Sequence, residues 1–127
     1  MLLLNSLAMA AIANEKKIVA IMEIEQPELE FDVYYSMDGV SYILYEDSLD
    51  LGTIPAGEQS RVYFNIISSK ELSLSTIVTG DAAIFEELYA EDFPLTIEEG
   101  DNKFSMRFDV REEAKEGNAE LEIFLNY

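Results

Sequence analysis

Residues 29–46, LEFDVYYSMDGVSYILYE, contain the alternation and the turn that decide the fold. From Leu29 to Met37, apolar or aromatic residues at every second position alternate with Glu30, Asp32, Tyr34 and Ser36. Because successive side chains of a strand point to opposite faces, this pattern predicts a strand with one buried and one solvated face. Asp38-Gly39 is a favoured hairpin sequence, so we expect a return strand over residues 40–46.

The same period-two pattern recurs along the rest of the chain and predicts further strands over residues 18–25, 61–67, 72–79, 95–98, 104–110 and 121–125. The first of these is apolar enough to be buried on both faces at its start. Residues 81–90 instead carry apolar side chains at helical spacing after a capping Asp81, which predicts a short crossover helix. The predicted fold is all-β: an immunoglobulin-like antiparallel β-sandwich of about seven to eight strands over residues 18–127, preceded by an apolar N-terminal helix.

Two turn motifs resemble those of a known family. Residues 51–58, LGTIPAGE, lead into a strand ending in Phe64-Asn65-Ile66, and residues 93–100, FPLTIEEG, lead into the strand at 104–110. This arrangement of turns and strands resembles that of the hydin/ASPM-type immunoglobulin-like domains. Residues 35–42, YSMDGVSY, followed by the first turn motif, also look like immunoglobulin-like modules of phage and surface-appendage proteins. The resemblance covers about three fifths of the chain. It implies a binding or architectural role without catalysis and carries over no functional residues.

The charge of the chain is strongly one-sided. It has 26 Asp and Glu against 8 Lys and Arg, a net charge of −18, and residues 18–60 hold ten acids and no base. Nucleic acids and anionic membrane surfaces are recognised through Lys and Arg, so neither is expected as a partner. The acidity itself is consistent with a solvated, self-repelling surface, a cation-binding surface or a basic protein partner.

The residue types needed for common catalytic chemistry are missing. The chain has no Cys and no His, which removes disulfides, thiolate nucleophiles, His general bases and His-containing metal sites. Neighbouring carboxylates are frequent, but with 26 of them chance proximity is expected. We therefore expect no catalytic residues and no enzyme activity.

One turn could bind a hard cation. Glu98, Glu99, Asp101 and Asn102 offer four side-chain oxygen donors around Gly100, and calcium prefers oxygen ligands of these types. The spacing differs from that of an EF-hand loop. The alternatives are a calcium site and an ordinary solvated acidic turn, and no other cofactor is expected.

The first 17 residues form an apolar segment followed by a polar one. Residues 1–13, MLLLNSLAMAAIA, are too few to span a membrane as a helix and lack the basic start of a secretory signal, whereas Leu and Ala favour a buried helix. We expect this helix to pack against a neighbouring subunit or against one end of its own domain. The residues predicted to make the assembly contact are Leu2, Leu3, Leu4, Leu7, Met9 and Ile12.

Together these features predict a structural subunit that packs against itself or decorates a larger assembly, such as a virion or a pilus-like surface filament, outside the cell or in a virion. The alternative is an independent secreted or surface module that binds a ligand, a cation or a basic protein. Exchange of a terminal segment between neighbours is one way in which such a domain can polymerise.

Overall fold

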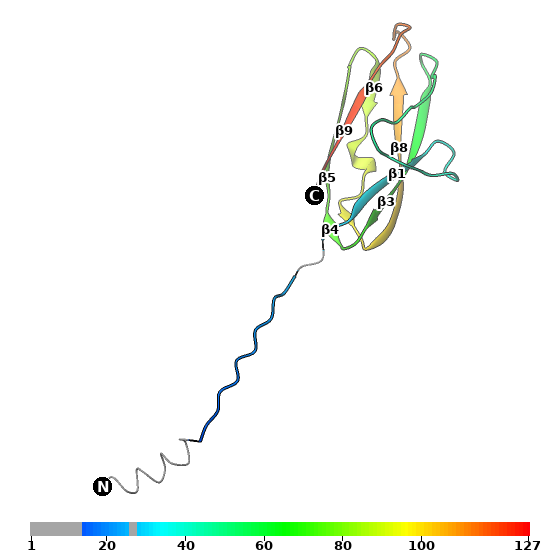
Figure 1. The fold of residues 1–127 in the computed structure, drawn as a ribbon. Helices are drawn as coiled ribbons and strands as arrows, with labels where there is room; N and C mark the ends of the chain where they lie inside the picture. The colour runs from blue at the N-terminus through cyan, green and yellow to red at the C-terminus, as the bar shows by residue number, and fades with distance from the viewer. Residues whose placement is uncertain (1–13, 26–27) are drawn as a thin grey trace.

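The structure, a computed structural model, describes residues 14–25 and 28–127. The regular elements in these residues are strands, with one short 3-10 helix, η1 (Ala90–Asp92) (Figure 1). The strands are β1 (Phe31–Ser36), β2 (Ile43–Leu44), β3 (Gln59–Ser68), β4 (Leu72–Ser73), β5 (Ser75–Gly80), β6 (Phe85–Leu88), β7 (Thr96–Ile97), β8 (Gly100–Val110) and β9 (Leu121–Asn126). Every strand pair is antiparallel, so the predicted all-β antiparallel class is confirmed.

The largest sheet has five strands in the order β2-β1-β3-β8-β6. Its centre is the long pairing of β3 with β8, which runs without interruption from Gln59 opposite Asp109 to Ser68 opposite Gly100. Alternate side chains of β3 are buried at Val62, Phe64 and Ile66, as the period-two pattern requires.

Two smaller sheets complete the fold, one formed by β4 and β7 and the other by β5 and β9. Apolar side chains of the β5–β9 pair, including Val78 and Ile123, pack on the cluster that Phe64 and Phe108 of the large sheet form. Ile66 of the large sheet packs in a second cluster with Ile97 of β7. Strands of different sheets therefore share their apolar cores, an arrangement compatible with a β-sandwich.

A hairpin connection around Asp38-Gly39 is present, but residues 37–42 join β1 to β2 in place of a tight turn that leads directly into a strand at residue 40. One Asp38 carboxylate oxygen, Oδ1, accepts hydrogen bonds from the Val40 and Ser41 backbone N–H groups at 2.8 and 2.9 Å and from the Ser36 hydroxyl at 2.8 Å. Gly39 has a φ of 76°, which a residue without Cβ adopts at low cost. The return strand β2 is limited to two residues, shorter than the predicted 40–46.

The predicted crossover helix over residues 81–90 is wrong. Asp81 does start one turn: its side chain accepts a hydrogen bond from the Ala83 N–H and its carbonyl accepts one from the Phe85 N–H, both at 2.9 Å. The turn ends there because β6 pairs with β8, and the Phe85 ring lies edge-on to Phe108 at 6.4 Å between centroids. Sheet pairing thus uses the apolar residues whose spacing indicated a helix.

The predicted buried strand over residues 18–25 is also wrong. These residues are extended, but they pair with no strand of the described chain, and their apolar side chains are exposed. Figure 1 shows the segment leading away from the sheets. The predicted N-terminal helix falls on residues 1–13, which lie outside the described part of the chain.

Candidate functional site

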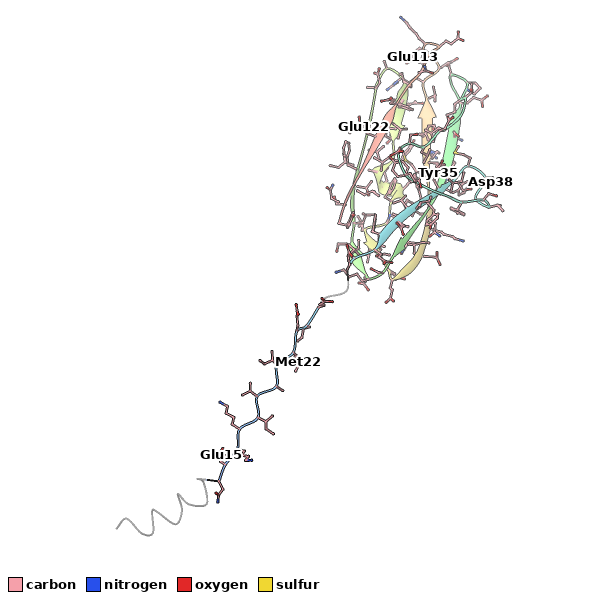
Figure 2. All side chains as sticks on the ribbon, in the orientation of Figure 1. Glu15, Met22, Tyr35, Asp38, Glu113 and Glu122 are labelled. Carbon is pink, nitrogen blue, oxygen red and sulfur yellow. The ribbon has the colours of Figure 1, made fainter. Side chains whose placement is uncertain are left out.

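The most exposed apolar surface of the described chain is the extended segment of residues 18–25. Ile18 and Ile21 are each 92% exposed, Met22 and Ile24 are each 78% exposed, and Val19 is 69% exposed. Met22 is seen on this segment in Figure 2, away from the sheets. A contiguous apolar stretch of this kind, flanked by charged residues, is typical of a protein interaction site.

Alternation divides this segment into two faces. One face carries Ile18, Ala20, Met22 and Ile24 and is wholly apolar, whereas the other begins with Val19 and Ile21 and ends with Glu23 and Glu25. As a strand, this segment would have one face suited to a protein core and one face suited partly to water. The alternation is present in the sequence, but these residues pair with no strand in the described part of the chain.

A sheet edge without a partner lies elsewhere in the fold. β9 pairs with β5 along its whole length, from Leu121 opposite Gly80 to Asn126 opposite Ser75. No other described strand pairs with β9 on its second edge. The side chains of Leu121, Ile123 and Leu125 point towards the core yet are only partly buried. Such an edge presents unpaired backbone N–H and C=O groups to any strand of matching pattern.

The outer face of the same pair is apolar at its centre. Ile77 of β5 lies directly opposite Phe124 of β9, and these side chains are 53% and 48% exposed. At the end of β9 the Tyr127 ring stacks on Phe31 with centroids 4.2 Å apart. The end of β9 therefore lies next to the start of β1, close to where the N-terminal segment joins the sheets.

The side chains of two of the four predicted calcium ligands, Asp101 and Asn102, are engaged in structural hydrogen bonds. Asn102 Oδ1 accepts from the Glu98 N–H at 2.9 Å, and its Nδ2 donates to the carbonyl oxygens of Glu98, Gly100 and Ile66. Asp101 Oδ1 accepts from the Asn65 side-chain amide at 3.0 Å. Gly100 to Asn102 belong to the start of β8, so the side chains that the sequence grouped in a turn are divided between a turn and a strand. Across the described residues, no group of three or more acidic side chains is arranged to hold a metal ion.

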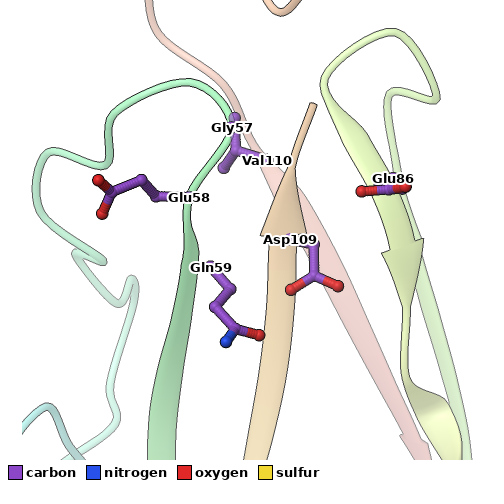
Figure 3. Close-up of a pocket in the computed structure, with 6 residues that line it drawn as sticks. All are labelled: Gly57, Glu58, Gln59, Glu86, Asp109 and Val110. Atoms are coloured by element: carbon purple, nitrogen blue, oxygen red, sulfur yellow. The ribbon is translucent and has the colours of Figure 1, made fainter. Parts of the chain in front are cut away.

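An acidic depression lies beside the end of β8 (Figure 3). Gly57, Glu58, Gln59, Glu86, Asp109 and Val110 line it, and three of these six residues carry carboxylates. Asp109 Oδ2 accepts a hydrogen bond from the Tyr89 hydroxyl at 2.9 Å, and the Arg107 guanidinium stacks over the Tyr89 ring at 4.4 Å. The Arg107 backbone N–H in turn donates to Asp92 at 3.1 Å. These contacts connect η1 to β8, so Tyr89, Arg107 and Asp109 have a structural role.

The predicted assembly residues Leu2, Leu3, Leu4, Leu7, Met9 and Ile12 lie outside the described residues. The structure instead directs attention to residues 18–25, which the sequence interpretation assigned to the buried body. One sequence signal could have separated them: unlike residues 29–37, residues 18–25 are not joined to the next strand by a hairpin turn sequence.

Comparison with protein-family models, with curated proteins and with solved structures finds no match to this chain. The described residues contain no helix of the length and apolarity needed to cross a membrane. The functional proposal therefore depends on the chemistry of the exposed segment and the free sheet edge.

Proposed function

We propose that the protein is a non-enzymatic architectural subunit, an immunoglobulin-like domain that joins copies of itself or a larger assembly through its N-terminal segment. The observation that carries this proposal is the extended, exposed and apolar stretch of residues 18–25. An assembly outside the cell, either a virion component or a surface filament, is the setting that we propose for it.

The energetics of the segment support association. Burying a large apolar side chain contributes about 1.5–3 kcal/mol, so the five exposed ones in residues 18–25 together contribute roughly 8–15 kcal/mol. Bringing two proteins together costs about 4–15 kcal/mol in lost freedom of motion. Side-chain burial is therefore comparable in size to this cost, and backbone pairing with a partner strand would add to the stabilisation.

The available chemistry supports a role without catalysis. The chain has neither His nor Cys, and Asp109 of the acidic depression is already bonded to Tyr89. A general base or nucleophile would require a side chain positioned at a reacting atom and free to change its protonation state.

A second surface favours the alternative of a binding module. The β1–β2 hairpin and the residue after it expose five large apolar or aromatic side chains, and exposed apolar side chains on an otherwise acidic domain suit a partner protein with an apolar centre and a basic rim. The residues are Met37, Val40, Ile43, Leu44 and Tyr45. In this alternative the N-terminal segment is not required for binding.

Light scattering after size-exclusion chromatography tests the main proposal, at about 0.15 M salt so that the Debye length falls to about 8 Å. We expect the full chain to self-associate. Ile21→Glu is expected to raise the protein concentration needed for self-association about tenfold or more, because a charge placed in the contact costs more than about 1.4 kcal/mol.

Leu95→Glu is the matched control, since Leu95 is 80% exposed on the body and lies outside the segment. Leu7→Glu tests whether residues 1–13 also contribute to the contact. A full chain that remains monomeric at all concentrations would contradict the proposal. Equal effects of Ile21→Glu and Leu95→Glu would show that the segment has no special role.

A further inference from the structure

The free edge of β9 is the best acceptor for an added strand in the described fold. β9 has six residues, whereas the edge strands β2 and β7 have two each and β6 has four. β5 also has six residues, but its other side lies against β6 and η1. A Cβ on Gly80 would point to the inner face of β5 and stand 2.8 Å from the Phe85 ring, so β6 packs closely against this end of the strand. Among the described strands, β9 combines a length of six residues with an edge on which no other described strand pairs.

We propose that residues 18–25 of one copy pair as an additional strand with the free edge of β9 in a second copy. This inference rests on the proposed function and names its acceptor surface. The segment has eight residues against the six of β9, so it covers the whole edge. Its apolar face would shield the partly buried side chains of Leu121, Ile123 and Leu125, which the two-stranded sheet leaves half open to water.

Charge and side-chain pattern favour one direction and one register. With the strands parallel and Ile21 beside Phe124, the apolar face of the segment falls beside the inward row of β9. In the same register Ile21 extends the outer apolar pair of Phe124 and Ile77, and Lys17 falls beside Glu120. The antiparallel alternative with Ile21 beside Phe124 places Glu23 opposite Glu122, and like charges directly opposite each other are destabilising.

The acceptor is assigned to a second copy because the segment is exposed in the isolated chain. Ile18 and Ile21 are each 92% exposed although the end of β9 lies close to where the segment joins the sheets. Its own β9 edge therefore does not cover the segment, and a neighbouring copy offers the same edge. Repetition of this contact is head-to-tail and generates a ring or a filament.

The lack of native cysteine allows a direct test by disulfide trapping in the full chain. Two single-cysteine proteins, Val19→Cys and Glu122→Cys, are mixed under mild oxidation, and the joined peptides are identified by mass spectrometry. Both side chains are exposed, so both variants are expected to fold. We expect the mixed disulfide at about tenfold or more over the control mixture of Val19→Cys with Ile43→Cys, because strand pairing raises the local thiol concentration to the millimolar range.

Further mixtures separate the possible outcomes. A stronger cross-link between Glu23→Cys and Glu122→Cys would overturn the parallel direction, and a preferred cross-link to Ile43→Cys would overturn the choice of β9. A disulfide that forms only within a chain carrying both Val19→Cys and Glu122→Cys, and not between separate chains, would overturn the exchange between copies. If light scattering shows self-association but no cross-link to Glu122→Cys forms, the acceptor site is wrong and the architectural function stands. A chain that does not self-associate would contradict both.

Discussion

Strand β3 and residues 18–25 carry the same alternation of apolar side chains and have opposite surroundings. β3 lies between β1 and β8, and its apolar row of Val62, Phe64 and Ile66 is buried, whereas Ile18 and Ile21 are exposed almost completely. The pattern of a sequence specifies which face of a strand is apolar, but not which chain supplies the strand beside it. The contrast distinguishes a strand that stabilises this domain from one that is available for a neighbour.

A change in the buried core is expected to have the greatest effect on stability. Phe108→Ala removes a fully buried ring from the common core and is expected to lower the free energy of unfolding by about 3–5 kcal/mol. Ile21→Ala is the matched change in the exposed segment and is expected to stay within about 0.5 kcal/mol of the parent. Urea unfolding at a concentration at which the protein is monomeric measures both. A large loss from Ile21→Ala would mean that the segment packs on its own body.

A smaller effect is expected from close packing on the inner face of β5. A Cβ at Gly80 would lie 2.8 Å from Phe85 Cδ2 and 3.1 Å from Leu88 Cδ1. Gly80→Ala is therefore expected to destabilise the fold by about 1–3 kcal/mol through overpacking. Thr79→Ala, one residue away and exposed, serves as the control in the same thermal or urea measurement. Equal stability of both variants would show that β5 and β6 are not tightly packed at this position.

The smallest expected effect is a local response to acid in the hairpin turn. Hydrogen bonds from the Ser41 and Val40 backbone and from the Ser36 hydroxyl lower the pKa of Asp38 from its ordinary value of 3.8 to about 2. A depressed pKa means that the ionised carboxylate stabilises the turn above pH 3.8, and that this contribution disappears as the pH falls from about 4 to about 2. The amide resonances of Val40 and Ser41 are expected to titrate with a midpoint near pH 2. They are expected to lose this response in Asp38→Ala, and a midpoint near pH 4 would contradict the hydrogen-bonded turn.

Much of the fold could be predicted because local chemistry and tertiary pairing agree. Clean alternation next to a turn signal marks residues 29–37 and 104–110. The structure places these two segments in β1 and β8, and the Asp38-Gly39 pair lies just after β1. The crossover helix failed because Phe85 and Leu88 fit a helix face and a sheet edge equally well, and the edge of β8 decides between them. Propensity is a weak guide when tertiary packing can use the same residues differently.

The candidate site was harder to predict for two physical reasons. Side-chain oxygens that are close in sequence, as at Asp101 and Asn102, point to opposite faces once they enter a strand, and the Asn102 amide is occupied by four hydrogen bonds. Whether an edge of β9 is free depends on the order of the strands in space, and that order cannot be predicted from local sequence patterns. The sequence could indicate an apolar interaction segment near the N-terminus, and the structure extends that expectation to residues 18–25.

The stacking of Tyr127 on Phe31 has a consequence for how the domain is made. The two rings touch across 96 positions of the chain (127 minus 31), and the β3–β8 pair also joins distant residues. Folding through such non-local contacts is slow, on a timescale of milliseconds to seconds for β-rich domains. During synthesis residues 18–25 leave the ribosome before the strands that close the domain exist. The apolar segment is thus exposed earlier than the sheet edges, and its pairing must wait until β9, whose translation begins 96 residues later (121 minus 25), has joined the sheet.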